Sequence, residues 1–366
     1  MDKVGIAVMN RGRQFEIDCV KFFAIFFMIS VHVYEELGVY DWSEMPADLF
    51  RNGIEFVGGP LAAPAFMFSM GIGMVYSRKN SAKELMKRGI KLLLTGYIFN
   101  FFRETILLIL GNLAGLDYSF EYIVASVFTV DILQFAGMAF LAIGFMKAVN
   151  ISTRYMLIVA ILLQALGMLG LHLSVSNVIL SDFISMILPI KDGVVFPMTL
   201  WLIYPVMGIM FAEILQKVAD KKTFYLRILI ISIALFVGIT AALMYIDYDI
   251  RLMYALYDNS YYCQSFLHVL WTLPIILTSI ALNYFIFSGI EKSRFAKFVT
   301  FCSSKLNTIY IIQWLLIAYT LAFGITISVK NGLVAWEIIV ASLIIMLLSV
   351  TLAKIIKKPE HHTRVK

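Results

Sequence analysis

Long apolar segments recur along the whole chain, and each is close to the length that crosses a lipid bilayer. About 20 consecutive apolar residues span the hydrocarbon core as an α-helix. The pattern predicts about ten such helices and no extramembrane domain. The predicted limits are 15–37, 52–76, 89–111, 122–147, 153–173, 196–217, 224–246, 263–287, 298–323 and 333–357. We therefore expect an all-α, polytopic membrane helix bundle that forms one domain over residues 1–366 and carries a short basic tail at 359–366.

The composition excludes a soluble domain, because 61% of the residues are apolar and only 15% are charged. The net charge of +6 could suggest nucleic acid as a partner. The basic residues instead lie in alternate short loops, whereas each loop of the other set has at most one Lys or Arg, so membrane topology explains the charge. The basic set is 11–13, 77–88, 147–154, 216–227, 291–297 and the tail. This alternation predicts that both termini are cytoplasmic in a multi-pass protein of the cell membrane.

The cysteines offer no metal or redox chemistry. Cys19, Cys263 and Cys302 are spread over different spans or span ends, which predicts no disulfide framework. The first apolar segment lacks a small-residue cleavage site, so we expect it to be retained as a helix.

Ionisable residues inside the spans fall into two layers when their depth is taken from the rise of about 1.5 Å per residue. Charges at membrane depth usually face a cavity or a partner. The outer layer holds His32, Glu55, Arg103, Glu104, Asp131 and His268. The inner layer holds Lys21, Lys91 and Lys305, beside the basic run Arg78, Lys79, Lys83, Lys87 and Arg88. The outer layer suits proton chemistry, and the inner one suits an anionic ligand.

Structural explanations compete with these functional ones. Lys21 and Lys91 can snorkel to the interface, and His268 can be a hydrogen-bonded packing residue. Arg103 and Glu104 are adjacent, hence about 100° apart on a helix, so we expect them to pair with other helices rather than with each other.

The glycines and prolines of the second span predict local irregularity. Gly58 and Gly59, with Pro60 and Pro64, predict an irregular or re-entrant start. The glycines of "FMFSMGIGM" predict close helix packing.

The opening segment "FEIDCVKFFAIFFMISVH" resembles the first helix of the membrane-bound acyltransferase 3 family. Asp18 and His32 match the family's aspartate and histidine, and Lys21 stands where the family has arginine. The segments "PLAAPAFMFSMGIGMVYSRK" and "LMKRGIKLLLTGYIFN" resemble its second and third helices. In "SSKLNTIYIIQWLLIAY", Gln313 stands where a histidine is common, and "VDILQFAGMAFL" also resembles the heparan-alpha-glucosaminide N-acetyltransferase group.

The resemblance implies an enzyme that uses acetyl-CoA or another acyl-CoA from the cytoplasm. The coenzyme phosphates would meet the inner basic residues, and the thioester would reach His32 as general base. Asp131 or Glu55 would orient that imidazole, and Arg103 would bind substrate or stabilise the oxyanion. The candidate phosphate-binding residues are Lys21, Lys87, Arg88, Lys91 and Lys305.

The implied acceptor is a hydroxyl or amine of an extracytoplasmic sugar, glycolipid or cell-wall component in a bacterial plasma membrane. No metal and no nucleic acid are expected as partners. No nucleophile elbow or Cys–His arrangement is evident, which favours direct transfer over an acyl-enzyme. O- or N-transfer, acyl length, a relay through acyl-histidine and a homodimer stay open.

Two other classes of function remain alternatives. A proton-coupled transporter or flippase would use the buried charges to relay protons, although no internal repeat supports it. A membrane scaffold or sensor would use them only for folding. Acyl-CoA turnover discriminates the enzyme from both.

Overall fold

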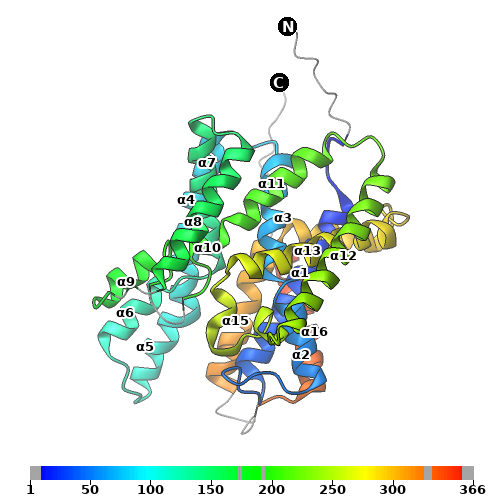
Figure 1. Ribbon diagram of the computed structural model, residues 1–366. Helices are drawn as coiled ribbons and strands as arrows, with labels where there is room; N and C mark the ends of the chain where they lie inside the picture. Colours follow the sequence, from blue (N-terminus) through cyan, green and yellow to red (C-terminus); the bar gives the residue numbers. More distant parts are fainter. Residues whose placement is uncertain (1–9, 172, 174, 191–193, 325–331, 357–366) are drawn as a thin grey trace, which may run out of the picture.

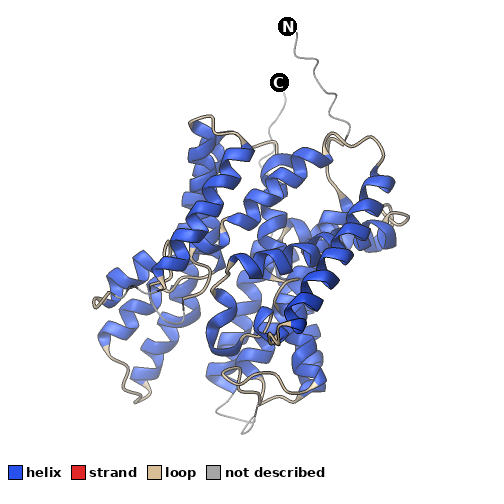
Figure 2. Ribbon diagram, in the orientation of Figure 1, coloured by secondary structure: helices blue, strands red, loops and turns tan. Residues whose placement is uncertain are grey.

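The computed structural model describes residues 10–171, 173, 175–190, 194–324 and 332–356 (Figure 1). The regular structure in these ranges is helical, apart from one isolated bridge between Gly38 and Leu333 (Figure 2). The predicted all-α bundle is therefore confirmed. The predicted tail at 359–366 lies outside the described residues.

The helices follow one another along the described chain with short connections. Their bounds are α1 Phe15–Leu37, α2 Leu49–Gly58, α3 Ala63–Tyr76, α4 Ala82–Asn100, the π-helical turn η1 Phe101–Thr105, α5 Ile106–Leu113, α6 Phe120–Phe128, α7 Ile132–Ala148, α8 Thr153–Gly170, α9 Val178–Ser185, α10 Met198–Trp201, α11 Ile203–Leu215, α12 Lys221–Tyr245, the 3₁₀ turns η2 Ile250–Met253 and η3 Tyr257–Tyr262, α13 Phe266–Phe287, α14 Arg294–Ser304, α15 Leu306–Gly324 and α16 Ala335–Ile355.

In the described ranges, nine helical segments are long and apolar enough to cross a membrane. The pair α6 and α7, bent by 47°, brings the number to ten if it counts as one span. These segments overlap the ten predicted ones, and the first has the predicted limits Phe15–Leu37. The protein is thus a multi-pass membrane helix bundle.

The connections gather at two opposite edges. The connections 77–81, 149–152 and 216–220 lie at the upper edge of Figure 1, and 38–48 and 114–119 lie at the lower edge. Lys147 Nζ donates to Asn80 O over 2.7 Å at the upper edge, and Leu333 N donates to Leu37 O over 2.7 Å at the lower one. These three basic loops therefore share one edge, and its assignment to the cytoplasm stays a prediction.

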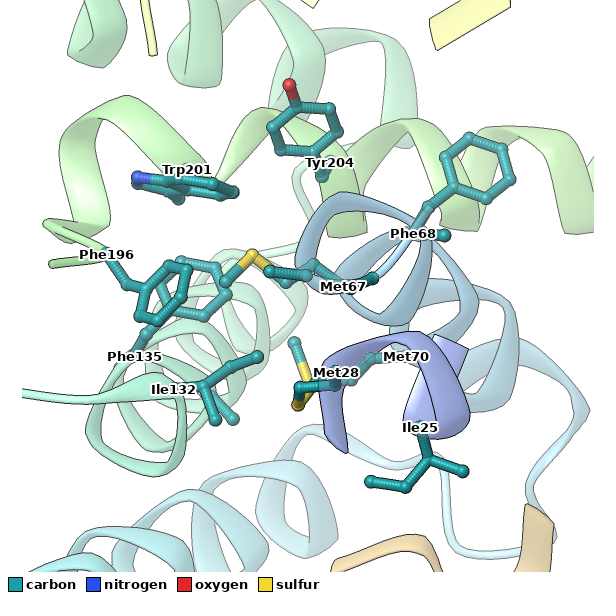
Figure 3. Packing of buried hydrophobic residues seen from close by; sticks show 14 of the residues in the cluster. Ile25, Met28, Met67, Phe68, Met70, Ile132, Phe135, Phe196, Trp201 and Tyr204 are labelled. Carbon is teal, nitrogen blue, oxygen red and sulfur yellow. The ribbon is translucent and has the colours of Figure 1, made fainter. Parts of the chain in front are cut away.

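Helix α1 lies at the centre of one half of the bundle, where it contacts α2, α3, α13, α14, α15 and α16. Around it, α4 packs on α7, α3 on α11, and α12 on α13. Much of α12 is exposed, as expected for a helix that faces lipid. The buried core between α1, α3, α7, α10 and α11 includes methionine and aromatic side chains among its apolar residues, for example Met28, Met67, Phe135 and Trp201 (Figure 3).

The crossing of α3 and α11 depends on glycine, as the small residues of the second span predict. A Cβ atom added to Gly71 would lie 1.9 Å from Pro205 O, and one added to Gly208 would lie 2.0 Å from Phe68 O. Because both obstacles are backbone atoms, neither helix can yield by rotating a side chain. Each glycine therefore sets the distance between the two helix axes.

We expect Gly71→Ala to lower the free energy of unfolding by about 3 kcal/mol, because the new methyl group forces two packed backbones apart. Denaturant unfolding in detergent micelles measures the change. The matched control is Gly238→Ala on α12, where nothing lies within 4 Å of the added Cβ. That variant should be neutral or slightly stabilising. Equal stability of the two variants would contradict the glycine-mediated crossing.

Several helix breaks differ from the sequence-based limits. The irregularity predicted in the second span is present, because α2 ends at Gly58 and α3 begins at Ala63. The fourth span also breaks, at 129–131, and the ninth divides into α14 and α15 at Lys305. The segment after α8, predicted as a loop, contains α9, whose first turn is capped by Asn177 Oδ1 accepting from Leu180 N over 2.9 Å.

Candidate active site

His32 lies in the half of α1 that is nearer the edge opposite the basic loops, and it is held by one face of α15. We call this half outer and the other inner, after the predicted orientation. Its Nδ1 lies 3.0 Å from Gln313 Nε2 and 3.4 Å from Gln313 Oε1. Its ring lies against Trp314, with centroids 4.1 Å apart and the two ring planes inclined by 32°. The imidazole is therefore fixed at Nδ1 and on one ring face. Its Nε2 makes no hydrogen bond to the described residues.

Arg103 and Asp131 form an ion pair beside this histidine. Arg103 NH1 donates to Asp131 Oδ2 over 2.5 Å, and the Tyr310 hydroxyl donates to the same oxygen over 2.8 Å. Arg103 NH2 also donates to Glu104 over 2.5 Å. The expectation that Arg103 and Glu104 pair only with other helices is therefore wrong for this contact, because the long arginine side chain reaches its neighbour and Asp131 together.

Two local departures from α-helix geometry position this pair. Arg103 lies in the π-helical turn Phe101–Thr105. Such turns occur often at functional sites. Asp131 is the N-cap of α7 and accepts from Ile132 N over 2.6 Å, so the break at 129–131 turns its carboxylate toward Arg103. Asn100 Nδ2 holds the end of α6 by donating to Val127 O and Thr129 O at 3.0 and 2.6 Å.

An outer cavity of about 530 Å³ opens beside these groups. Its lining includes His32, Arg103 and Trp314. The other acidic and aromatic lining residues are Glu35, Glu36, Glu104, Asp131 and Asp182, with Trp42, Tyr122, Phe196 and Tyr262. The aromatic residues of the loops at the outer edge differ in their surroundings. Trp42 and Tyr262 line the cavity, whereas Tyr261 is buried and its hydroxyl donates to Gly59 O over 2.9 Å.

A small cavity of about 30 Å³ adjoins the outer one and shares His32 and Asp131 with it. It extends to Met28, one helical turn closer to the start of α1. His32 therefore borders space on two sides.

An inner cavity of about 180 Å³ collects three cations, Lys21, Arg88 and Lys305. The side chains of Lys21 and Lys305 make no hydrogen bond or ion pair within the described ranges, and Arg88 lies over the Phe140 ring at 4.5 Å. The first turn of α15 also lines this cavity, through Asn307 and Thr308. The first N–H groups of a helix have no intrahelical acceptor, so they favour an anion. Lys21 precedes His32 by roughly 16 Å along α1.

The structure does not bring every predicted residue to these cavities. Glu55 accepts from the Tyr34 hydroxyl at 2.5 Å and from Leu256 N at 2.9 Å, which leaves it outside the cavity lined by His32. Its carboxylate instead ties the turn at 256 to α1 and α2. Asp131, the other carboxylate expected to orient His32, lies in the site but hydrogen-bonds to Arg103, Tyr310 and Ile132. Gln313 takes the orienting position.

Lys87 and Lys91 are exposed and do not line the inner cavity. They share a face of α4 with Leu94 and Ile98, which are exposed as well, and this supports the snorkelling explanation. His268 is a packing histidine, with Ser265 Oγ at 2.8 Å from Nδ1 and Leu252 O at 3.1 Å from Nε2.

Sequence reasoning overlooked part of the site. Glu35 and Glu36 follow His32 by three and four residues, so helical spacing alone places them on its face of α1. Tyr310, Gln313 and Trp314 share the corresponding spacing on α15.

Within the described ranges, no three His, Cys, Asp or Glu side chains are arranged to hold a metal ion.

Comparison with known proteins gives one match. No curated protein and no solved structure matches the chain. The acyltransferase 3 family, described as an acyltransferase domain, matches residues 14–356, which is nearly the whole chain. The site therefore lies in a multi-pass membrane acyltransferase that belongs to the acyltransferase 3 family.

Proposed function

We propose that this protein moves an acetyl or other short acyl group from cytoplasmic acyl-CoA to a hydroxyl or amine of an extracytoplasmic carbohydrate or glycolipid. The donor would occupy the inner cavity and the acceptor the outer one. His32 carries this proposal, because it lines the outer cavity and the small cavity and its Nε2 has no hydrogen-bond partner among the described residues.

The inner cavity suits the phosphates of a coenzyme A donor. Lys21, Arg88 and Lys305 supply positive charge, and the first turn of α15 adds backbone donors. Because Lys21 and Lys305 lack an anionic partner among the described residues, their charge is available to a ligand. The basic loops of the same edge would attract the donor before it enters.

The acyl arm must then cross the core between the inner and small cavities. These two cavities share no lining residue, so side chains have to move when the donor enters. Met70 lines the inner cavity and Met28 the small one, and both belong to the same buried cluster (Figure 3). Methionine side chains are unbranched and flexible, which suits a passage that opens for a thin ligand.

In the transfer itself, the acceptor oxygen or nitrogen attacks the thioester carbonyl as its proton passes to His32 Nε2. The carbon–sulfur bond breaks, and the departing thiolate takes the proton from the imidazolium, so the products are the acylated acceptor and free coenzyme A. Nε2 can accept a proton only while Nδ1 carries one, so Gln313 must present its oxygen to Nδ1–H. A half-turn of its terminal amide exchanges oxygen and nitrogen in the contact.

Arg103 would stabilise the negative charge that develops on the carbonyl oxygen. It lines the outer cavity, it is 7% exposed, and its Nε has no acceptor among the described residues. Asp131, Glu104 and Tyr310 hold the guanidinium in place, so little reorganisation is needed during the reaction.

The donor site gives a direct test. We expect Lys21→Gln and Lys305→Gln each to raise the KM for acetyl-CoA about tenfold, because each removes one unpaired cation from the phosphate site. Lys87→Gln and Lys91→Gln are matched controls on the same side of the bundle, and they should leave that KM within twofold. Isothermal titration with acetyl-CoA and steady-state kinetics measure both sets. Equal effects in all four variants would mean that these lysines only attract the donor by general electrostatics and do not form a phosphate site. Absence of acetyl-CoA binding would favour a transporter.

A further inference from the structure

We propose that the outer cavity selects an acceptor that carries a positive charge, such as an amino sugar or amino alcohol, and rejects anionic acceptors. This inference rests on the proposed function and names the class of acceptor for the same site. We base this inference on the carboxylates that line the cavity. Two of them have no bonded partner among the described residues, and both lie close to His32 along α1.

Among the described residues of the cavity lining, acidic side chains outnumber basic ones. Glu35, Glu36, Glu104 and Asp131 lie there with one guanidinium, that of Arg103, and with His32. Arg103 donates to Asp131 and Glu104 and makes no hydrogen bond to Glu35 or Glu36, so these two carboxylates lack a directly bonded cation among the described residues. Inside a membrane bundle such an excess is costly unless water or a cation compensates it. An acceptor with an ammonium group supplies that cation, and a carboxylate or phosphate on the acceptor would add repulsion.

Glu35 and Glu36 are the residues available for such a contact. Neither carboxylate makes a hydrogen bond or ion pair with the described part of the chain. On a helix, residues three and four apart have Cβ atoms about 5–6 Å from each other. The side chains of Glu35 and Glu36 therefore leave α1 about one turn beyond His32, on the same face of the helix. An acceptor whose cationic group is a few bonds from its reacting hydroxyl or amine would reach both.

The remaining lining suits a small polar ring or chain. Trp42, Tyr122 and Tyr262 provide aromatic surface, which stacks on sugar rings and attracts cations. The volume of about 530 Å³ lies in the range of small-molecule sites. Arg103, more than nine-tenths buried and with its Nε unpartnered among the described residues, leaves one donor for the reacting end of the ligand. The unpartnered Nε of Arg103 is a second observation, separate from the carboxylates, and it also indicates a site for a substrate.

The experiment compares matched acceptors on the purified protein in lipid nanodiscs with acetyl-CoA at pH 7. One set is glucosamine, glucose and glucuronate, and the other is ethanolamine, ethylene glycol and glycolate. We expect kcat/KM to be at least tenfold higher for the cationic member than for the neutral one, and lowest for the anionic member. In the double variant Glu35→Gln/Glu36→Gln, the preference for the cation should fall about tenfold, because two attracting charges are removed. The KM for acetyl-CoA should stay unchanged.

The control variant is Glu44→Gln, which removes a carboxylate at the same edge but outside the cavity lining. It should keep the cationic preference in full. Retained acetyl-CoA binding shows that each variant is folded. A wild-type preference for neutral or anionic acceptors, or an undiminished cationic preference in the double variant, overturns the inference. Transfer to none of the six compounds while acetyl-CoA still binds also overturns it, whereas a protein that does not bind acetyl-CoA overturns the proposed function itself.

Discussion

We expect His32→Ala to lower the turnover number for acyl transfer about a thousandfold, because the acceptor then loses its proton without a positioned base. The KM for acetyl-CoA should change little, since the donor phosphates would bind near Lys21, roughly 16 Å away along the helix. A continuous assay of free thiol release, with acceptor present and absent, separates transfer from hydrolysis.

The matched control for this variant is His268→Ala. His268 is also a partly buried histidine in the outer half of the bundle, but its two ring nitrogens lie against Ser265 and Leu252, outside the cavities. Its replacement should affect thermal stability and leave the turnover number within about threefold. Full activity in His32→Ala, or equal losses in both variants, would contradict the role of His32 as base.

Arg103→Met should lower the free energy of unfolding by about 3–5 kcal/mol, because it leaves Asp131 and Glu104 without their shared cation in a buried site. Activity should be lost as well, since the same guanidinium serves the proposed oxyanion. Denaturant unfolding in micelles, followed by tryptophan fluorescence, measures the stability change.

Two further variants separate charge burial from a general loss of contacts. The triple variant Arg103→Met/Glu104→Gln/Asp131→Asn removes the carboxylates together with their partner, and it should recover much of the lost stability while remaining inactive. Arg251→Met breaks an ion pair with Asp249 in which both side chains are over a third exposed, so it should cost less than about 1 kcal/mol. If the triple variant were less stable than Arg103→Met, the ion pair would not be the cause.

The approximate number and positions of the spans could be predicted because they follow from local properties. Apolar length decides whether a helix crosses the bilayer, and loop charge decides its direction. The first span, Phe15–Leu37, is defined by both, and its structure has the predicted ends. The inner cations Lys21 and Lys305 could also be placed at one depth by counting residues.

The side of each helix that faces the cavities, and the hydrogen-bond partners of the buried side chains, could not be derived in the same way. Lys87, Arg88 and Lys91 have similar depths, but only Arg88 lines the inner cavity, because helix rotation is set by the packing of α4 on α7. Glu55 and Asp131 are both outer carboxylates by depth. Glu55 is bonded to Tyr34 and Leu256 N, a backbone group that is 201 residues away in the chain. Such long-range partners depend on the tertiary arrangement, which residue spacing does not encode.

The π-helical turn of the third span also limits how the length of this segment can change. A π-helical turn holds one residue more than the α-helical turn it replaces, and each residue of a regular α-helix turns the chain by about 100°. Deleting one residue between Phe101 and Thr105 would therefore restore regular winding but rotate one side of the helix relative to the other. In such a deletion variant, either Arg103 would lose its contact with Asp131 or the lipid-facing surface of α4 would turn toward the bundle interior. In homologous chains whose third span lacks the extra residue, the carboxylate that caps α7 should therefore bind a residue at a different position of the third span.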